Sequence, residues 1–213
     1  MKNNKTEIVF ILDRSGSMSG LEKDTIGGYN SFLRKQKNEE GDAVVSTVLF
    51  DHKTEVLHDR ADIKDVRDIT EKEYYVRGTT ALLDAVGSAI THIREVQFKE
   101  EIKPDRTVFV IITDGYENSS REYTYPLLKR MIERQKAEGW EFLFLGANID
   151  AAEEARKFGI DEDRSVRFHN DPCGVAVNFE TVSAAISEIR HEKKLSKGWK
   201  KSIEADYKSR NSK

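Results

Sequence analysis

The sequence predicts an α/β protein with a doubly wound, mostly parallel sheet and helices on both faces. The uninterrupted apolar run at 8–12 and the similar pattern at 107–112, which is apolar after Thr107, are typical of strands that are buried on both faces. Further apolar runs alternate with helical patterns along most of the chain, as in parallel sheets with crossover helices. A polar turn at 51–54 separates two strand patterns and predicts one short antiparallel strand at the edge of the sheet.

The first half of the chain predicts three strands and two helices. Ile26, Tyr29 and Leu33 recur at helical spacing within 21–37, and the polar stretch 38–42 ends the pattern. Strands are expected at 43–50 and 55–58, and the charged stretch 62–76 predicts a short helical turn and irregular loop. A long amphipathic helix then follows residue 81, with its apolar stripe at Leu82, Val86, Ile90 and Ile93.

The second half continues the alternation after the strand at 107–112. A helix is expected at 126–138, where Gly139 stops it, and a buried strand follows at 140–146. Asp150 is expected to cap a short helix that runs to Phe158. An edge strand at 165–168 and a final helix complete the pattern, the helix with an inward stripe of Phe179, Val182, Ile186 and Ile189.

Composition indicates one domain and narrows the class of protein. The 213 residues are 38% hydrophobic, enough for a single core, and we expect the domain to span 1–192. No apolar run approaches the roughly 20 residues that cross a bilayer, and the first residues do not resemble a signal peptide. A single cysteine, Cys173, excludes an intrachain disulfide and a cysteine-based zinc site. We therefore expect a cytoplasmic protein with no membrane partner.

The C-terminal stretch 193–213 is basic although the chain as a whole has a formal net charge of −3. It holds eight Lys and Arg residues against Glu204 and Asp206. Such a tail can bind nucleic acid or an acidic partner, but a solvated terminus is the more common explanation, so nucleic-acid binding is not expected. Its apolar residues are sparse, and they could also prolong the last helix: Leu195, Trp199 and Ile203.

The most informative stretch begins where the first buried strand ends. Asp13, Ser15 and Ser17 stand at alternate positions, and Gly16 gives the loop the freedom to curl them toward one point. The carboxyl ends of such strands open into the crevice where α/β sheets hold ligands. Carboxylate and hydroxyl oxygens suit a small hard cation such as Mg²⁺ better than zinc. The alternative is a plain strand-to-helix turn in which Asp13 or a serine caps the helix.

Two other segments carry the same kind of chemistry. Thr79 and Thr80 follow Gly78 at the start of a predicted helix, where they could also act simply as N-caps. The strand at 107–112 ends in Thr113-Asp114-Gly115, so a second buried strand leads into an aspartate. Strands that flank the switch point of a doubly wound sheet are neighbours, which predicts that Asp13 and Asp114 face the same crevice.

Together these segments resemble the von Willebrand factor A (VWA) family and its metal-ion-dependent adhesion site (MIDAS). The resemblance covers about residues 6–190, and it implies a VWA-type sheet with a divalent cation, normally Mg²⁺ although Mn²⁺ or Ca²⁺ is possible, at its upper rim. Thr79 is preferred over Thr80 because the family usually shows Gly-Gly-Thr, and Arg77 departs from that pattern. The implied ligands are Asp13, Ser15, Ser17, Thr79 and Asp114.

The resemblance also implies what such a site does. Two carboxylates balance the charge of the dication, and an open coordination position would accept an Asp or Glu side chain from a partner protein. We therefore expect a protein-binding module that is not an enzyme and that has no small-molecule substrate. Its cytoplasmic character places it nearer small stand-alone prokaryotic members of the family, some of which resemble tellurium-resistance-associated proteins.

The main alternative is a metal-dependent phosphotransferase on a similar sheet, with Asp13 as nucleophile. Enzymes of the haloacid dehalogenase type resemble Asp-x-Asp at this point, but position 15 is Ser here, so the second carboxylate that would act as general acid is missing. A nucleotide-binding enzyme is disfavoured because neither Gly-x-Gly-x-x-Gly nor a Walker segment occurs.

Overall fold

The computed structural model describes residues 4–192 and 194–211. A six-stranded sheet in the order β3-β2-β1-β4-β5-β6 forms the middle layer, and all neighbouring strands are parallel except β2 and β3. The predicted doubly wound sheet with an antiparallel edge strand is therefore confirmed. The strands are β1 (Thr6–Asp13), β2 (Ala43–Phe50), β3 (Thr54–Asp62), β4 (Arg106–Thr113), β5 (Glu141–Ala147) and β6 (Ser165–Phe168).

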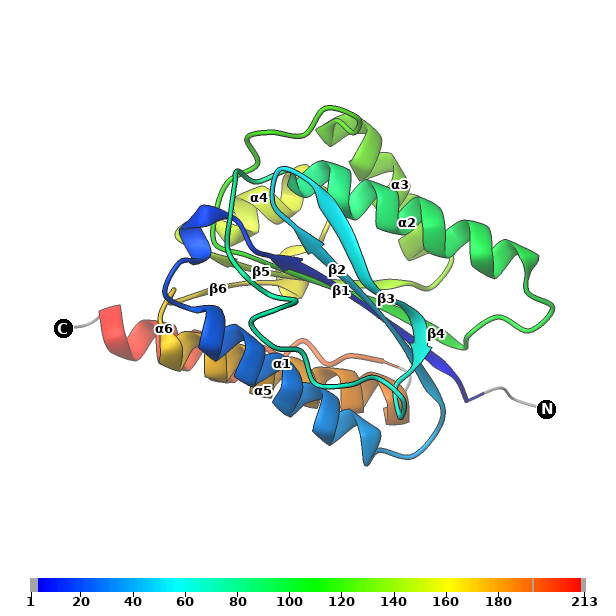
Figure 1. Cartoon of the computed structure of the whole chain (residues 1–213). Helices are drawn as coiled ribbons and strands as arrows, with labels where there is room; N and C mark the ends of the chain where they lie inside the picture. Colours follow the sequence, from blue (N-terminus) through cyan, green and yellow to red (C-terminus); the bar gives the residue numbers. More distant parts are fainter. Residues whose placement is uncertain (1–3, 193, 212–213) are drawn as a thin grey trace.

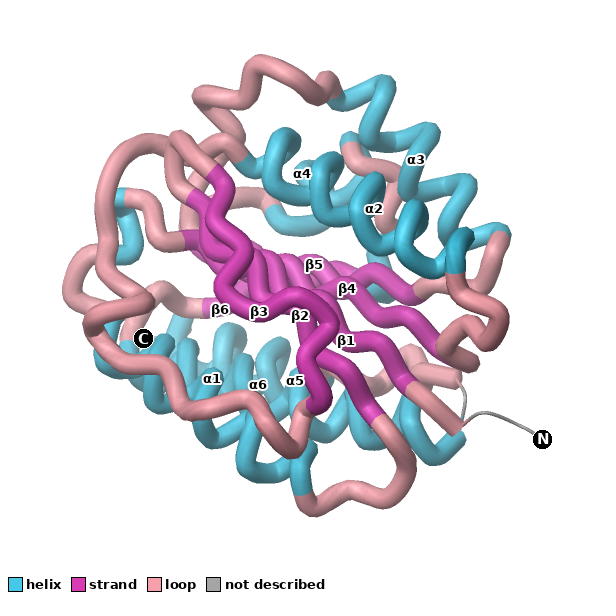
Figure 2. Tube along the Cα trace, turned by 45° about the vertical axis from the view of Figure 1, so that its right-hand side comes forward, coloured by secondary structure: helices cyan, strands magenta, loops and turns pink. Residues whose placement is uncertain are grey.

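Helices cover both faces of this sheet (Figure 1). On one face lie α1 (Glu22–Lys37), α5 (Pro172–Glu192) and α6 (Lys201–Asn211). On the other lie α2 (Leu82–Lys99), α3 (Tyr125–Ala137) and α4 (Ala151–Lys157). Figure 2 shows the two helical layers separated by the twisted strands. In the described part of the chain, no helix is long and apolar enough to cross a membrane.

The apolar strands supply two separate cores because their side chains alternate between the faces. Along β1, Ile8, Phe10 and Leu12 point toward the α1 and α5 layer, whereas Val9 and Ile11 point toward α2. Every residue of β1, β2 and β4 is buried, as expected for central strands of a covered sheet. This rigid centre fixes the positions of the loops that follow β1 and β4.

The structure extends β3 beyond the predicted 55–58. Its pairing with β2 continues to Val44 and Asp62, through a break in register between Val45 and Val48. The sequence did not reveal the added residues because much of β3 is exposed and polar, so no apolar alternation marks it. After β3, the stretch 62–76 forms single turns and loop, closed by bonds such as Val66 N to Asp62 O.

The basic C-terminal stretch packs onto the domain in its described part, where a solvated terminus was expected. Leu195, Trp199 and Ile203 are all buried against the α1 and α5 core. Trp199 Nε1 also donates to Asp163 O at 2.8 Å. Only Ile203 belongs to the following helix, and Leu195 and Trp199 lie in the loop and turn before it, so burial of these apolar side chains, and not a helical stripe, accounts for the packing. The stretch forms a separate helix, α6, that does not prolong α5.

Candidate metal centre

The candidate centre lies where β1 and β4 end side by side. The two strands are parallel and in register up to the pair Leu12 and Ile112, so their carboxyl ends meet at the same edge of the sheet. Asp13 is the last residue of β1, and Asp114 comes directly after β4. A short 3₁₀ turn, Gly16–Met18, follows β1 and is anchored by the buried Met18. The predicted meeting of the two aspartates is confirmed by this register.

Hydrogen bonds hold Asp13 in a fixed orientation. Its Oδ1 accepts from the Ser15 backbone N–H at 2.7 Å, which closes a turn typical of aspartate. Its Oδ2 accepts from Thr113 Oγ1 at 2.6 Å. Both partners are uncharged, so the carboxylate is positioned by the protein without being neutralised.

The second carboxylate, that of Asp114, connects the other residues of the centre. Ser17 Oγ donates to Asp114 Oδ1 at 2.5 Å, and Ser15 Oγ lies 3.0 Å from Ser17 Oγ. Asn170 Nδ2, from the loop between β6 and α5, donates to Asp114 Oδ2 at 2.9 Å. Four of the five residues proposed from the sequence are therefore brought together: Asp13, Ser15, Ser17 and Asp114.

The structure favours Thr80, and not Thr79, as the threonine of this centre. Thr79 is exposed, whereas Thr80 is buried. A Cβ added at Gly115 would lie 3.5 Å from both Ser17 Oγ and Thr80 Oγ1, so these hydroxyls converge beside the glycine that follows Asp114. Both threonines follow a glycine before a helix, and only packing against the loop after β4 distinguishes them.

Two further residues contribute in roles that the sequence did not reveal. Thr113 stands in the segment Thr113-Asp114-Gly115, but nothing in the sequence showed that its hydroxyl bonds Asp13, and Asn170 lies 56 positions beyond Asp114 in the chain. Each of these contacts forms only through the tertiary fold. Both residues hold a carboxylate oxygen, which is the role expected of groups that orient metal ligands.

The centre concentrates negative charge without a cation of its own. Asp13 and Asp114 are 1% and 2% exposed, and among residues 4–192 and 194–211 no Lys, Arg or His forms an ion pair with either. Burial raises the pKa of Asp13 to about 6, against the opposing hydrogen bonds from Thr113 and Ser15. Burial also raises the pKa of Asp114. Two desolvated carboxylates are costly unless a positive charge joins them.

The donor set fits a hard dication. Carboxylate and hydroxyl oxygens are the ligands of Mg²⁺, Mn²⁺ and Ca²⁺. Across the described residues, no group of three or more His, Cys, Asp or Glu side chains could hold a metal. Here two carboxylates are combined with three hydroxyls, and Gly16 and Ser17 are exposed, so the centre is open on its outer side.

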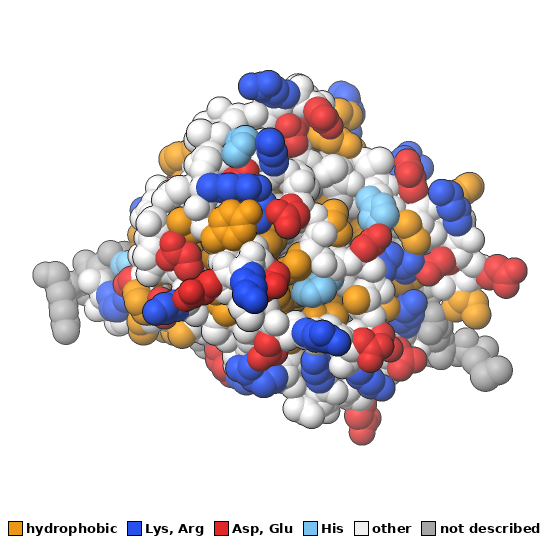
Figure 3. Space-filling view, viewed as in Figure 1, with side chains coloured by type: hydrophobic (Ala, Val, Ile, Leu, Met, Phe, Trp, Pro, Cys, Tyr) orange, Lys and Arg blue, Asp and Glu red, His pale blue; other side chains and the backbone are white. Residues whose placement is uncertain are grey.

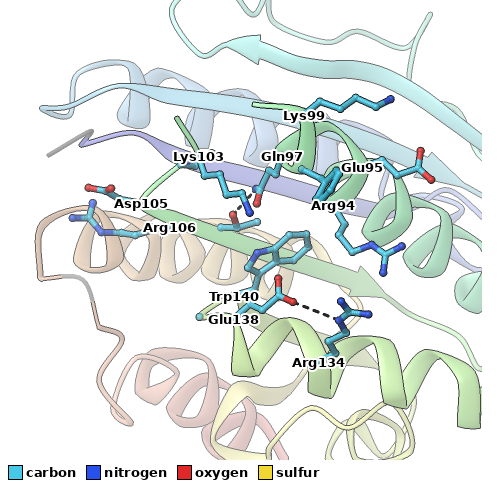
Figure 4. A pocket seen from close by; sticks show the side chains of 14 residues that line it. Arg94, Glu95, Gln97, Lys99, Lys103, Asp105, Arg106, Arg134, Glu138 and Trp140 are labelled. Carbon is cyan, nitrogen blue, oxygen red and sulfur yellow. Dashed lines mark hydrogen bonds and ion pairs between the residues drawn. The ribbon is translucent and has the colours of Figure 1, made fainter. Parts of the chain in front are cut away.

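A cavity of about 770 Å³ lies at the opposite edge of the sheet. Figure 4 shows it between the C-terminal ends of α2 and α3, beside Trp140 and the ion-paired Arg134 and Glu138. It borders the first residues of β4, whereas the candidate centre follows the last residue of that strand. The cavity and the centre are therefore separate features.

A family model described as "VWA domain containing CoxE-like protein" matches residues 1–152. The chain belongs to this VWA family. The match includes every residue of the candidate centre except Asn170, so the family assignment and the geometry point to the same edge of the sheet. No curated protein matches this VWA domain.

Solved structures share the fold at low sequence identity. The proximal thread matrix protein 1 of the mussel byssus, solved with a zinc-occupied MIDAS motif, is 16% identical at a TM-score of 0.58, covering 85% of this chain and 46% of that one. The vWF domain of the pili tip protein Mfa5 from Porphyromonas gingivalis is 12% identical at 0.62, covering 90% and 98%. A von Willebrand factor type A protein from Catenulispora acidiphila is 19% identical at 0.59, covering 85% and 42%.

These likenesses show the fold of the chain. The VWA domain described here spans slightly less than half of the mussel byssus protein, so it corresponds to one part of that larger molecule. The predicted VWA-type sheet is confirmed by the family match and the neighbours together.

Proposed function

We propose that this VWA domain is a protein-binding module that depends on a divalent cation, with Mg²⁺ as the expected ion and Mn²⁺ or Ca²⁺ as alternatives. The observation that carries the proposal is the pair of buried carboxylates that lack a protein cation and meet three hydroxyls at an open edge of the sheet. In this proposal Thr80 takes the place that the sequence suggested for Thr79. The proposed ligands are Asp13, Ser15, Ser17, Thr80 and Asp114.

The arrangement favours capture of an acid from another protein. Two carboxylates balance the charge of a dication, while neutral hydroxyls donate little charge, so the ion would still attract an anionic oxygen. The exposed Gly16 and Ser17 leave room above the centre for an Asp or Glu side chain. A zinc-occupied MIDAS in a structural neighbour supports metal binding by this fold, and a pilus adhesin among the neighbours supports a binding role.

The residues of the centre give little support to a phosphotransferase with Asp13 as nucleophile. Position 15 is Ser, and its hydroxyl lies 3.0 Å from Ser17 Oγ, where such an enzyme would need a second carboxylate as general acid. The adhesion and matrix proteins among the neighbours also favour a non-enzymatic role.

The two adjacent threonines provide a matched test. Isothermal titration with Mg²⁺ or Mn²⁺ should show metal binding that Thr80→Ala weakens at least about 10-fold, because a hydroxyl ligand is removed. Thr79→Ala makes the same change one residue away on an exposed side chain and should leave the affinity unchanged. Equal affinities in both variants and the parent would contradict the proposed ligand set.

A second experiment tests whether a partner protein binds through the metal. A lysate of the source cell passed over immobilised protein should yield a binder that is retained with Mg²⁺ and released by chelator. Thr80→Ala protein should lose that binder, whereas Thr79→Ala protein should keep it. A binder that survives chelator would show that the metal is not the point of attachment.

A further inference from the structure

An exposed arginine and tyrosine stand beside the candidate centre and are fixed to its loop by the backbone. Arg77 N donates to Arg14 O at 2.8 Å, and Gly16 N donates to Gly78 O at 3.1 Å. The segment 75–78 therefore lines the loop that carries Ser15 and Ser17. Tyr75 is 41% exposed and the Arg77 side chain 40% exposed, so both face solvent at this rim.

Arg77 is held rigidly by groups below it. Its Nε donates to Asp51 Oδ2 at 2.7 Å and its Nη1 to Tyr75 Oη at 3.2 Å. The guanidinium carbons of Arg14 and Arg77 lie 5.2 and 5.3 Å from the centre of the Tyr75 ring, within cation–π range. The guanidinium is thus positioned before any ligand arrives, which reduces the entropy lost on binding.

The outer end of Arg77 retains unused hydrogen-bonding capacity. Glu55 Oε2 lies 4.0 Å from Arg77 Nη2, beyond hydrogen-bonding distance, but only 2.6 Å from Arg14 Nη2. Asp51 Oδ2 is shared, because Arg14 Nε also donates to it at 3.0 Å. Glu55 is thus directed mainly toward the buried Arg14. Asp51, which both arginines share, lies slightly closer to Arg77. Among the contacts of the described residues, Arg77 Nη2 makes no hydrogen bond, and the Arg77 side chain is 40% exposed, so this nitrogen can donate to an external acceptor.

From this geometry we propose that the partner segment carries two acidic residues. One carboxylate would bind the metal, as the proposed function requires, and the second would pair with Arg77 while the intervening residues contact Tyr75. Residues 77 and 80 are three apart in the chain, so their Cα atoms are at most about 11 Å apart, a distance that about three extended residues span. The structure therefore assigns an acidic pair separated by one to three residues as the recognised feature.

Single ion pairs are a better basis here for selecting an acidic partner than a broad area of positive charge on the surface. Figure 3 shows Lys and Arg side chains interspersed with Asp and Glu on the face it presents, without a large area of one sign. Arg77 Nη2 would donate a charge-assisted N–H bond whose direction is set by the fixed guanidinium plane, which the ammonium of a lysine would not provide. Arg77 would accordingly add specificity to a metal contact that any accessible acid could make.

The test uses synthetic peptides and the whole chain. A glycine-serine peptide with one Glu is compared with peptides that carry a second Glu after one, two or three residues. Dissociation constants are measured by NMR titration of the ¹⁵N-labelled protein with Mg²⁺ and again with chelator. We expect at least one two-Glu peptide to bind about 5- to 20-fold more tightly than the one-Glu peptide, as for an added charge-assisted hydrogen-bonded pair.

Variants separate this inference from the proposed function on which it rests. Arg77→Gln should bring the ratio of the two-Glu to the one-Glu affinity close to one, whatever the change in the one-Glu affinity itself, and Arg77→Lys should restore part of that ratio. Arg134→Gln, the same change at an exposed arginine at the opposite edge of the sheet, should change nothing. Thr80→Ala should abolish the Mg²⁺-dependent binding of every peptide.

Each other outcome overturns a defined statement. Equal Mg²⁺-dependent affinities for one-Glu and two-Glu peptides would overturn the role of Arg77 and leave the metal-dependent module standing. A gain from the second Glu that persists in Arg77→Gln would also overturn it. Absence of Mg²⁺-dependent binding by any peptide would contradict both the proposed function and this inference.

Discussion

The two ends of β1 each bury a carboxylate, and the two carboxylates differ in whether the fold supplies a cationic partner. Glu7 and Asp13 are 0% and 1% exposed in the same strand. Glu7 receives Arg60 Nε at 2.5 Å and Gln97 Nε2 at 2.7 Å, so its charge is paired within the fold. Asp13 receives hydrogen bonds from Ser15 and Thr113, which are uncharged. The chain thus completes a structural ion pair at one end and leaves an unbalanced charge at the other.

A third buried carboxylate shows that arginines are available near the centre. Asp51, at the end of β2, is fully buried and is contacted by Arg14 and Arg77. Their hydrogen bonds and charges outweigh burial and lower the pKa of Asp51, whereas burial raises the pKa of Asp13. Arg14 adjoins Asp13 in sequence yet turns toward Asp51. The missing counterion at Asp13 is therefore a local property of the centre.

The substitution Arg60→Met should have the largest effect, and it tests the end of β1 at which Glu7 is ion-paired. Removing the guanidinium leaves Glu7 buried without a cation, which should lower the free energy of unfolding by about 3–5 kcal/mol, measured by chemical denaturation. Metal affinity should not change, because six residues of strand, roughly 20 Å, separate Glu7 from Asp13. The double variant Glu7→Gln/Arg60→Met should recover most of the loss. If Arg60→Met left the free energy of unfolding unchanged, the burial of Glu7 would not depend on Arg60.

The matching change at the other end is Asp13→Asn, and its effect on stability should have the opposite sign. A carboxyl pKa raised from 3.8 to about 6 costs the metal-free fold up to about 3 kcal/mol at pH 7, and the amide removes that cost. The melting temperature without metal should therefore rise while Mg²⁺ binding is lost. Because the cost appears only as Asp13 ionises, the gain should be greatest above pH 6 and disappear below about pH 4.

Asn170→Ala should have the smallest effect of the three. It removes the amide that donates to Asp114 Oδ2, and loss of a group that orients a metal ligand typically weakens metal binding about 10-fold or somewhat more. Titration calorimetry with Mn²⁺ measures this change in metal affinity directly. Asn178→Ala, at a buried amide in α5, provides a control for structural damage. A larger loss than in Thr80→Ala would place Asn170 among the ligands themselves.

Most of the fold followed from sequence because buried parallel strands have continuous apolar runs, as in β1 and β4. The meeting of Asp13 with Asp114 followed from that topology, since each comes where a central strand ends. The sequence could not decide between Thr79 and Thr80, because both have the same local context and only contact with the loop after Asp114 distinguishes them. Asn170 was missed because a single amide in a loop carries no periodic pattern.

The central claim is that the carboxylates of Asp13 and Asp114 are balanced by an external dication. A crystal structure of the protein soaked in Mn²⁺, with an anomalous difference map, tests it most directly. The account predicts one strong peak among the side-chain oxygens of Asp13, Ser15, Ser17, Thr80 and Asp114. No peak there at a saturating Mn²⁺ concentration, or a peak only at some other site, would contradict it.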